Sequence, residues 1–376
     1  MFWKKRKTEN RPLKLVVTSD WHHLSPSMHD MDEEFRRMLI QGDGKLTEYS
    51  TEIIQGILDE AVREKADAIL MCGDLTYDGD AVSLLELKRM LEEVQKKGVK
   101  VFLIPGNHDT DNGFACAYRN GTSEKAQMVS HAMFMEEMKE SGYAHAVSHD
   151  KNSFSYMQAL NEKVWLLALD ANAGAYGMVR KSTMQWAEKV LTKAKRKGVM
   201  VLGMTHQNLL AQSQFMGDGF TVRNAPEIRN LFEKYDIRVN FSGHAHLQHH
   251  VCTDALTEYC TGSLTVNKEC FGIVTVENNG VQYETKHLHV HEEQARKRFM
   301  DTVSFQVRHT LEDKGIPEDI MEEMTDYAAR VNSAYFAEED HLGKYREEEA
   351  WRLWQMYGQE SFWYAYMCSF FSEADT

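Results

Sequence analysis

The sequence lacks the features of a disulfide-stabilised or membrane-spanning protein. Its six cysteines form no C-x-x-C pair and no framework spacing, and no apolar run reaches the length of a membrane-crossing helix. We therefore expect reduced, mostly buried thiols in a cytoplasmic protein without a membrane segment in this chain. A disulfide between Cys252 and Cys260 across a hairpin is the weaker alternative.

The chain also lacks an excess of positive charge. Lys and Arg number 43 against 57 Asp and Glu, which gives a formal net charge of −14. A protein that binds nucleic acid in bulk needs a basic face, so we expect no such binding. The acidic balance does not exclude an anionic substrate, because bound divalent cations outweigh the surrounding field at short range.

The N-terminal tail, residues 1–12, is basic but is not followed by the apolar stretch of a signal peptide. A signal or lipoprotein segment upstream of the given start stays an open alternative. The 376 residues are enough for one large domain and a smaller one.

Residues 13–290 have the pattern of an α/β domain. Strand-like apolar runs occupy Leu13–Ser19, Ala68–Cys72, Val99–Pro105, Val164–Leu169, Val199–Thr205 and Arg238–Ser242. Helical stretches between the early runs, Ser50–Glu64 and Ser83–Lys97, predict parallel strands flanked by helices. Short strands follow from His249, with Asn278-Asn279-Gly280 as a hairpin turn. An α/β half that passes into an antiparallel half predicts a two-sheet sandwich with helices outside.

Residues 291–376 have the pattern of a small all-α domain. Charge-rich helices are expected over Glu292–Lys314, Pro317–Glu339 and Lys344–Phe371, and Gly315 and Gly343 supply stop and start signals. The last of these helices is dense in aromatic residues. They predict either the packed core of a small helical bundle or an exposed contact surface, which would be a homo-oligomer interface or a pocket wall.

Five short polar clusters lie along the first 246 residues, and four of them end or directly follow a strand-like run. They are Asp20-Trp21-His22, Gly73-Asp74, Gly106-Asn107-His108-Asp109, His206 and Gly243-His244-Ala245-His246. If the strands lie side by side, each brings one or two of these side chains to a common edge. Carboxylate, imidazole and amide oxygen together suit hard and borderline divalent metals.

This set of motifs resembles the calcineurin-like, binuclear metallophosphoesterase family, whose motifs run D-x-H, G-D, G-N-H-D/E, H and G-H-x-H in this order. The resemblance covers roughly residues 13–290, and no ligand position is substituted. It implies a four-layer αββα sandwich as the catalytic domain. Similar bacterial phosphodiesterases of the family carry a helical C-terminal domain, which agrees with the boundary at residue 291.

The resemblance also implies the metal ligands. Asp20, His22 and His246 would hold one metal, Asn107, His206 and His244 would hold the other, and Asp74 would bridge the two. A bridging carboxylate offsets the repulsion of two dications about 3.5–4 Å apart. His244 and His246 would point to opposite faces of a flat strand, so the chain must turn there. Nitrogen and oxygen ligands suit Mn, Fe or Zn.

In the family, a histidine at the position of His108 stands above the metals without binding them. A metal-bridging hydroxide would attack phosphorus, and His108 would protonate the departing alkoxide. Asp78 and Asp109 are the candidates for a carboxylate that orients this imidazole. A residue adjacent to His108 rarely faces the same way, so Asp109 is the better candidate for orienting the backbone.

The second motif, at Gly73-Asp74, restricts the class of substrate that we expect. Protein Ser/Thr phosphatases carry an arginine in this motif, whereas the segment Gly73–Gly79 has none. A phosphomonoester dianion usually needs such a clamp, so the absence favours a small phosphodiester, with a cyclic nucleotide as the leading class. Tyr77 stands where purple acid phosphatases bind Fe(III), but those enzymes lack the equivalent of His22. Packing or pocket lining is therefore the favoured role of Tyr77.

Two other functions stay open from the sequence. A phosphomonoesterase or nucleotide pyrophosphatase could use the same pair of metals. From a different class, a metal-binding interaction scaffold is the alternative, although the presence of His108 beside all seven ligand residues argues against it.

Overall fold

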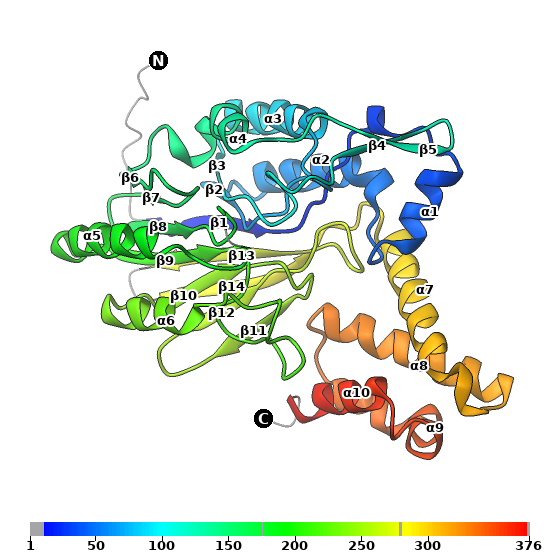
Figure 1. The fold of residues 1–376 in the computed structure, drawn as a ribbon. Coiled ribbons are helices and arrows are strands. Elements are labelled where there is room, and N and C mark those ends of the chain that lie inside the picture. Colours follow the sequence, from blue (N-terminus) through cyan, green and yellow to red (C-terminus); the bar gives the residue numbers. More distant parts are fainter. Residues whose placement is uncertain (1–10, 175, 278–279, 374–376) are drawn as a thin grey trace.

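The computed structural model describes residues 11–174, 176–277 and 280–373. Two mixed β-sheets face each other, helices cover their outer faces, and four helices from the C-terminal part lie at one end (Figure 1). This arrangement is the two-sheet sandwich with helices outside that the sequence predicts. Residues 1–10 of the predicted basic tail and Asn278 and Asn279 of the predicted turn lie outside the described residues.

The first sheet has the strand order β14-β13-β1-β2-β3. Its strands are β1 (Leu13–Thr18), β2 (Ala68–Met71), β3 (Lys100–Leu103), β13 (Cys270–Glu277) and β14 (Gly280–His287). β1, β2 and β3 are parallel, and β13 pairs with β1 antiparallel. Helices α2 (Ser50–Arg63), α3 (Ala81–Lys96) and α4 (His131–Glu137) belong to this half.

The second sheet has the order β11-β12-β10-β9-β8-β7-β6. Its strands are β6 (Ser148–His149), β7 (Tyr156–Ala159), β8 (Val164–Leu169), β9 (Met200–Thr205), β10 (Val239–Ser242), β11 (His249–Cys252) and β12 (Thr257–Cys260). β8, β9, β10 and β12 run parallel. Helices α5 (Lys181–Lys197) and α6 (Ala225–Lys234) pack on its outer face.

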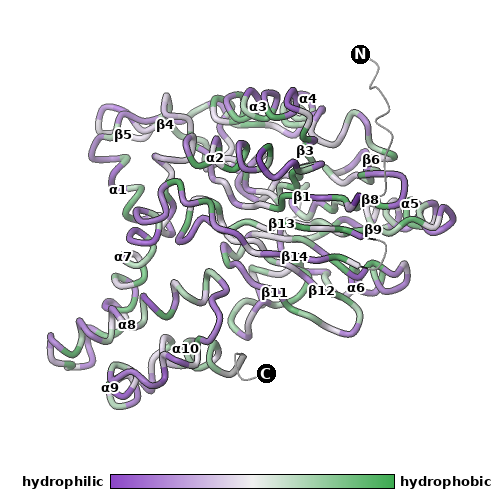
Figure 2. The backbone as a smooth tube through the Cα atoms, turned by 180° about the vertical axis from the view of Figure 1, so that it is seen from behind, coloured by the Kyte–Doolittle hydropathy of each residue, from purple (hydrophilic) through white to green (hydrophobic). Residues whose placement is uncertain are grey.

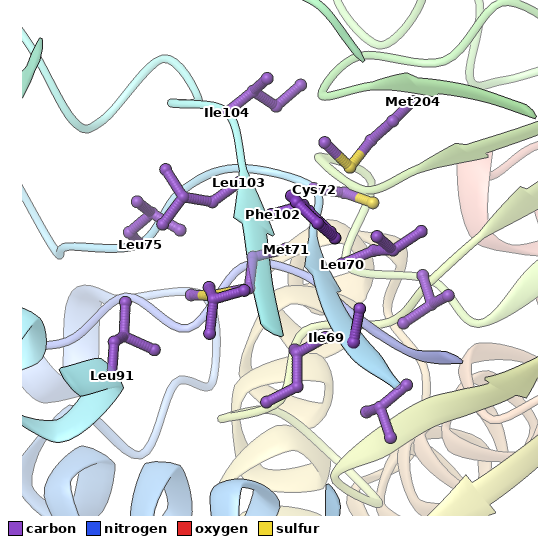
Figure 3. Packing of buried hydrophobic residues seen from close by; sticks show 14 of the residues in the cluster. Ile69, Leu70, Met71, Cys72, Leu75, Leu91, Phe102, Leu103, Ile104 and Met204 are labelled. Atoms are coloured by element: carbon purple, nitrogen blue, oxygen red, sulfur yellow. The ribbon is translucent and has the colours of Figure 1, made fainter. Parts of the chain in front are cut away.

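The main core lies between the sheets and continues beneath α2 and α3. Because strand side chains alternate between faces, Leu166 and Ala168 of β8 point into this core, whereas Leu167 and Leu169 pack against α5 and α6. Figure 3 shows Met204 of the second sheet close to Cys72 at the end of β2. From behind, the outer helices alternate between hydrophilic and hydrophobic residues (Figure 2), as amphipathic helices do.

The strands expected from the sequence form within a few residues of their predicted bounds. The way in which the late strands are divided between the two sheets differs from the prediction. The late antiparallel strands do not make up a half of their own. β13 and β14 extend the first sheet, and β11 and β12 extend the second. Strand patterns predict local structure, whereas pairing across more than 200 residues depends on which sheet edge is free.

An insert between β1 and α2, residues 19–49, carries helix α1 (Glu33–Gln41). The hairpin of β4 (Cys116–Arg119) and β5 (Thr122–Lys125) packs against it and is joined to it by a bridge between His29 and Tyr118. The insert has its own small core, made by Leu24, Met28, Phe35 and Leu39.

The described residues of the C-terminal part contain four α-helices. They are α7 (Glu292–Leu311), α8 (Glu318–Phe336), α9 (Glu349–Tyr357) and α10 (Phe362–Glu373). The single helix predicted over Lys344–Phe371 is wrong, because the chain leaves the helix at Gly358 and starts again after Ser361, whose hydroxyl accepts a hydrogen bond from the Tyr364 amide. Aromatic clustering alone does not reveal such a break.

Most aromatic side chains of this part are buried. Trp354, Phe370 and Phe371 are fully enclosed, and Phe370 stacks on Tyr335 of α8. The helices also share a core with Ala245, Leu247, Cys260 and Val266 of the sheet region. Packing therefore accounts for most of this aromatic segment. A separate domain beginning at residue 291 and a homo-oligomer interface stay predictions.

The described residues contain neither a membrane-spanning helix nor a disulfide. None of the helices there is both long and apolar enough to span a membrane. The six cysteines are free, and Cys260 pairs in register with His249 rather than with Cys252.

A buried carboxylate, Glu258 of β12, ties the loop after β9 to the second sheet. It accepts hydrogen bonds from the amides of Leu209 (2.9 Å) and Leu210 (2.6 Å) and from Asn240 Nδ2 (2.8 Å). Burial raises the pKa of Glu258 to about 6, so the group is ionised at pH 7.5.

We expect Glu258→Gln to lower the free energy of unfolding by about 2–4 kcal/mol at pH 7.5, because the new amide NH₂ would face buried N–H donors. Urea denaturation followed by circular dichroism measures the change. Glu277→Gln, at an exposed position of β13, is the matched control and should change stability by less than about 0.5 kcal/mol. Equal effects of the two substitutions would contradict the expectation.

Candidate metal centre

Seven polar side chains from five loops converge at the carboxyl ends of neighbouring strands. Asp20 and His22 follow β1, Asp74 follows β2, Asn107 follows β3, His206 follows β9, and His244 and His246 follow β10. Parallel strands present the loops after them at one edge, so residues distant in sequence meet there.

The backbone of these loops is contorted. Five of the seven residues have a positive φ, namely Asp20 (52°), His22 (44°), Asp74 (50°), His244 (69°) and His246 (55°). Residues with a side chain rarely adopt this conformation, and its concentration here is typical of functional sites. The two positive φ values at His244 and His246 provide the turn that these residues, two apart in sequence, require.

Two glycines make the close approach of the loops feasible. A Cβ on Gly73 would lie 2.5 Å from His206 Nδ1. A Cβ on Gly106 would lie 2.7 Å from Cγ of Asp74 and closer still to its Oδ1. Only a residue without a side chain fits either position.

One group of ligand-type atoms contains Asp20, His22, Asp74 and His246. The Nε2 atoms of His22 and His246 are 3.0 Å apart, and Asp20 Oδ1 lies 3.5 Å from His246 Nε2. Asp20 Oδ1 is buried and has no hydrogen-bond partner among the described residues. An unpartnered buried carboxylate oxygen costs free energy, and a cation would compensate it. These donors fit a divalent metal.

A second group contains Asp74, His206 and His244, with Asn107 beside them. His206 Nε2 is 3.3 Å from Asp74 Oδ2 and 3.0 Å from Asn107 Oδ1. The other ring nitrogen of His206 donates to the Cys72 carbonyl (2.8 Å), and His244 Nε2 donates to the Gly219 carbonyl (2.8 Å). Such outer hydrogen bonds fix the ring orientation of metal-binding histidines.

Asp74 belongs to both groups through one oxygen. Its Oδ2 lies 3.3 Å from His206 Nε2 and 3.9 Å from His22 Nε2. Burial raises the pKa of Asp74, but the imidazoles of His206 and His108 outweigh it and hold this pKa well below its usual range. Asp74 is therefore ionised, as a carboxylate shared by two cations must be.

His108 stands at the open side of this cluster, with 34% of its side chain exposed. Its Nδ1 lies 2.8 Å from the Tyr77 carbonyl and 3.2 Å from Asp78 Oδ1, while Nε2 faces Asp74 Oδ2 at 4.0 Å. Burial lowers the pKa of His108, but Asp74 and Asp78 outweigh it and raise this pKa to about 9. Of the two candidate carboxylates, Asp78 is therefore the one in contact with the ring.

Asp109 is buried and binds backbone amides. It accepts hydrogen bonds from the amides of Gly106 (2.7 Å), Leu75 (3.1 Å) and Thr76 (2.8 Å). The side chain therefore ties the loop after β2 to the loop after β3. This is the backbone-orienting position that the sequence favours for Asp109.

Tyr77 packs against the small core of the insert. Burial and the neighbouring carboxylates Asp78 and Asp43 raise the pKa of its phenol. Its place against this core agrees with the packing role.

Sequence reasoning missed Lys45 in the insert and Gly219 in the loop after β9. Lys45 carries a charge that acts on His22 and His108. Neither residue lies in a motif, and only the three-dimensional path of these long loops brings them to the site.

The two mixed sheets bring carboxylates and imidazoles together in two groups that could each hold a metal ion. A family model described as "Calcineurin-like phosphoesterase" matches residues 13–248, more than half of the chain. The chain belongs to the calcineurin-like phosphoesterase family.

Two curated proteins are similar in sequence to this chain. The chain is 22% identical over 194 residues, 51% of its length, to a "Probable cyclic nucleotide phosphodiesterase" of Ruthia magnifica subsp. Calyptogena magnifica, and covers 68% of that protein. It is 38% identical over 52 residues, 14% of its length, to a protein of the same name from Vesicomyosocius okutanii subsp. Calyptogena okutanii, covering 21% of that protein.

Among solved structures, a dimetal phosphatase from Danio rerio superposes with a TM-score of 0.51 at 11% identity. The superposition covers 74% of this chain and 97% of that chain. At this identity the likeness bears on the fold alone.

We expect Gly106→Ala to weaken divalent-metal binding at least about tenfold, because the added Cβ displaces the Asp74 carboxylate. Calorimetric titration of metal-stripped protein with Mn²⁺ measures affinity and stoichiometry. Gly217→Ala is the matched control, since a Cβ there meets nothing within 4 Å. Unchanged binding in Gly106→Ala would show that the approach of the two loops does not position Asp74.

Proposed function

We propose that this protein is a divalent-metal-dependent phosphodiesterase that hydrolyses a small phosphodiester, with a cyclic nucleotide as the leading class. The observation that carries the proposal is the position of Asp74 Oδ2. One carboxylate oxygen faces both groups of ligand-type atoms, and the imidazole of His108 lies above it.

Under this proposal, Asp20, His22 and His246 hold one metal, Asn107, His206 and His244 hold the other, and Asp74 bridges them. Two bound cations would supply Lewis acidity toward a phosphoryl oxygen and would lower the pKa of a water molecule. The donor set suits Mn, Fe or Zn, and cellular availability decides among them.

His108 would act as the general acid. Asp78 and the Tyr77 carbonyl hold its Nδ1, so Nε2 points toward the site. An imidazolium in that position donates its proton to the leaving oxygen, which is a poor leaving group without it. The partial exposure of His108 leaves it accessible to a substrate.

Two observations support a diester. The segment Gly73–Gly79 contains no arginine that could clamp a phosphomonoester dianion, and the two curated relatives carry the name of cyclic nucleotide phosphodiesterases. The net charge of −14 argues against a long polyanion as substrate.

Activity on matched substrates tests the proposal. We expect metal-stripped protein to be inactive and Mn²⁺-loaded protein to hydrolyse bis(p-nitrophenyl) phosphate at least about tenfold faster than p-nitrophenyl phosphate. A panel of cyclic mononucleotides, cyclic dinucleotides and glycerophosphodiesters then identifies the substrate class. A preference for the monoester would favour the phosphomonoesterase alternative. Metal binding without hydrolysis of any substrate would indicate a scaffold.

We expect His108→Ala to keep two metals per chain but to lose about 100-fold or more in kcat on diesters with alkoxide leaving groups. The loss should be much smaller for p-nitrophenolate, which departs without protonation. His145→Ala is the control, since that side chain is 75% exposed and lies outside the site. Equal losses for both kinds of leaving group would remove His108 from the role of proton donor.

A further inference from the structure

Two aromatic side chains lie beside His244, one of the candidate metal ligands. The ring centroids of Tyr176 and His244 are 6.5 Å apart, and those of Phe220 and His244 are 6.0 Å apart. Tyr176 belongs to the loop between β8 and α5, and Phe220 belongs to the loop between β9 and α6. Ring contacts therefore connect both residues to the candidate metal centre, and the chemistry proposed above uses neither of them.

Tyr176 leaves much of its ring free for a ligand, since 54% of the residue is exposed. The exposed aromatic residues in the described part of the chain are Phe114, Tyr176, Phe305 and Phe362, and of these Tyr176 has a ring contact with a ligand candidate. Phe220 is half-buried and packs on the core shared with the C-terminal helices. An apolar surface next to a cluster of polar ligands is typical of a small-molecule site.

Hydrogen bonds between the two loops hold the chain close to Tyr176. The Arg223 amide donates to the carbonyl of Gly177, the next residue after Tyr176 (2.7 Å). The side chain of Asn224 accepts from the Val179 amide (3.1 Å) and donates to the Val179 carbonyl (3.0 Å). The backbone beside Tyr176 is therefore attached to the loop between β9 and α6.

The loop between β9 and α6 is attached in turn to the candidate metal centre. The Gly219 carbonyl accepts a hydrogen bond from His244 Nε2 (2.8 Å). The next residue, Phe220, donates its amide to the Gly217 carbonyl (3.2 Å), and its carbonyl accepts from the Asn208 amide (3.1 Å). The backbone at both aromatic residues is thus fixed before a ligand arrives, which lowers the entropic cost of binding.

We propose that Tyr176 is a substrate-binding residue whose ring stacks on the base of a nucleotide, and that Phe220 supplies a second apolar surface for that base. The inference rests on the proposed function and narrows its substrate to a nucleotide. Every base has a π face that stacks on an aromatic ring, whereas a glycerophosphodiester has none. Only the sugar separates the phosphate of a nucleotide from its base, so a ring in contact with His244 lies within reach.

Two ligands that resist hydrolysis isolate the contribution of the base. They are the phosphonate analogue of adenosine monophosphate and methylphosphonate, which offers the anionic group without a base. We expect the Mn²⁺-loaded parent to bind the adenosine phosphonate at least about tenfold more tightly, because stacking on an aromatic ring adds to binding of the anion. Calorimetry measures both affinities. Equal affinities, or no binding of either ligand, overturn the proposal.

Tyr176→Ala should weaken binding of the adenosine phosphonate at least about fivefold, with methylphosphonate affinity and two metals per chain retained. Tyr176→Phe should keep the affinity, and Tyr176→Leu should lose most of it, because leucine is apolar but has no π face. Phe305→Ala is the matched control, since that residue is 74% exposed and its ring stacks on His309 of α7. Equal losses for both ligands in Tyr176→Ala, or full affinity in Tyr176→Leu, overturn the stacking role.

The contribution of Phe220 has its own measurement. Phe220→Leu should weaken binding of the adenosine phosphonate about threefold, less than Tyr176→Ala does, because leucine keeps part of the apolar surface. An equal loss for methylphosphonate, or the loss of a bound metal, would show that Phe220 only supports the loop at His244 and would overturn its part in the proposal.

Kinetics separate this inference from the proposed activity. Tyr176→Ala should raise KM for a cyclic nucleotide at least about fivefold with kcat near the parent value, and should leave KM unchanged for any glycerophosphodiester that the protein hydrolyses. If the protein binds the adenosine phosphonate through Tyr176 but hydrolyses nothing, the proposed activity fails and the assignment of Tyr176 stands. If it hydrolyses diesters and Tyr176→Ala changes no KM, the activity stands and the inference fails.

Discussion

The position of one carboxylate, Asp74, constrains most of the local structure around it. Its Oδ2 lies within 4.0 Å of three imidazoles, those of His206 after β9 of the second sheet and of His22 and His108 in two loops of the first sheet. That placement needs a left-handed residue at the end of β2 and the absence of side chains at Gly73 and Gly106. It also needs Asp109, which joins the loops after β2 and β3 through their amides. The packed core beneath holds these strained loops in place.

The C-terminal helices pack against the elements that surround the site. They share a core with residues at the ends of β10 and β12. Arg298 of α7 binds Glu48 of the insert, and Phe299 of α7 lies beside Gly44 of the insert. The insert in turn carries the small core against which Tyr77 packs. A region remote in sequence from the motifs therefore packs against Ala245, which lies between the ligand candidates His244 and His246.

The fold and the cluster of ligand-type residues were largely predictable because their signals are local. Apolar runs such as Val164–Leu169 mark buried strands, and four of the five motifs end or directly follow such a run. The contact between Asp78 and the His108 ring could not be derived from the sequence, because it depends on how the loop after β2 folds. Lys45 has no motif around it, and the break at Gly358 depends on how the helices pack rather than on their composition.

The placement of β13 has a consequence for how the chain is made. β1 is a central strand whose antiparallel neighbour, paired from Leu13 with Val276, is separated from it by most of the phosphoesterase region. During synthesis, the ribosome must release residues 270–277 before one side of β1 can be covered. Until then the nascent polypeptide carries an open sheet edge, the kind of surface on which chaperones act and from which aggregation begins.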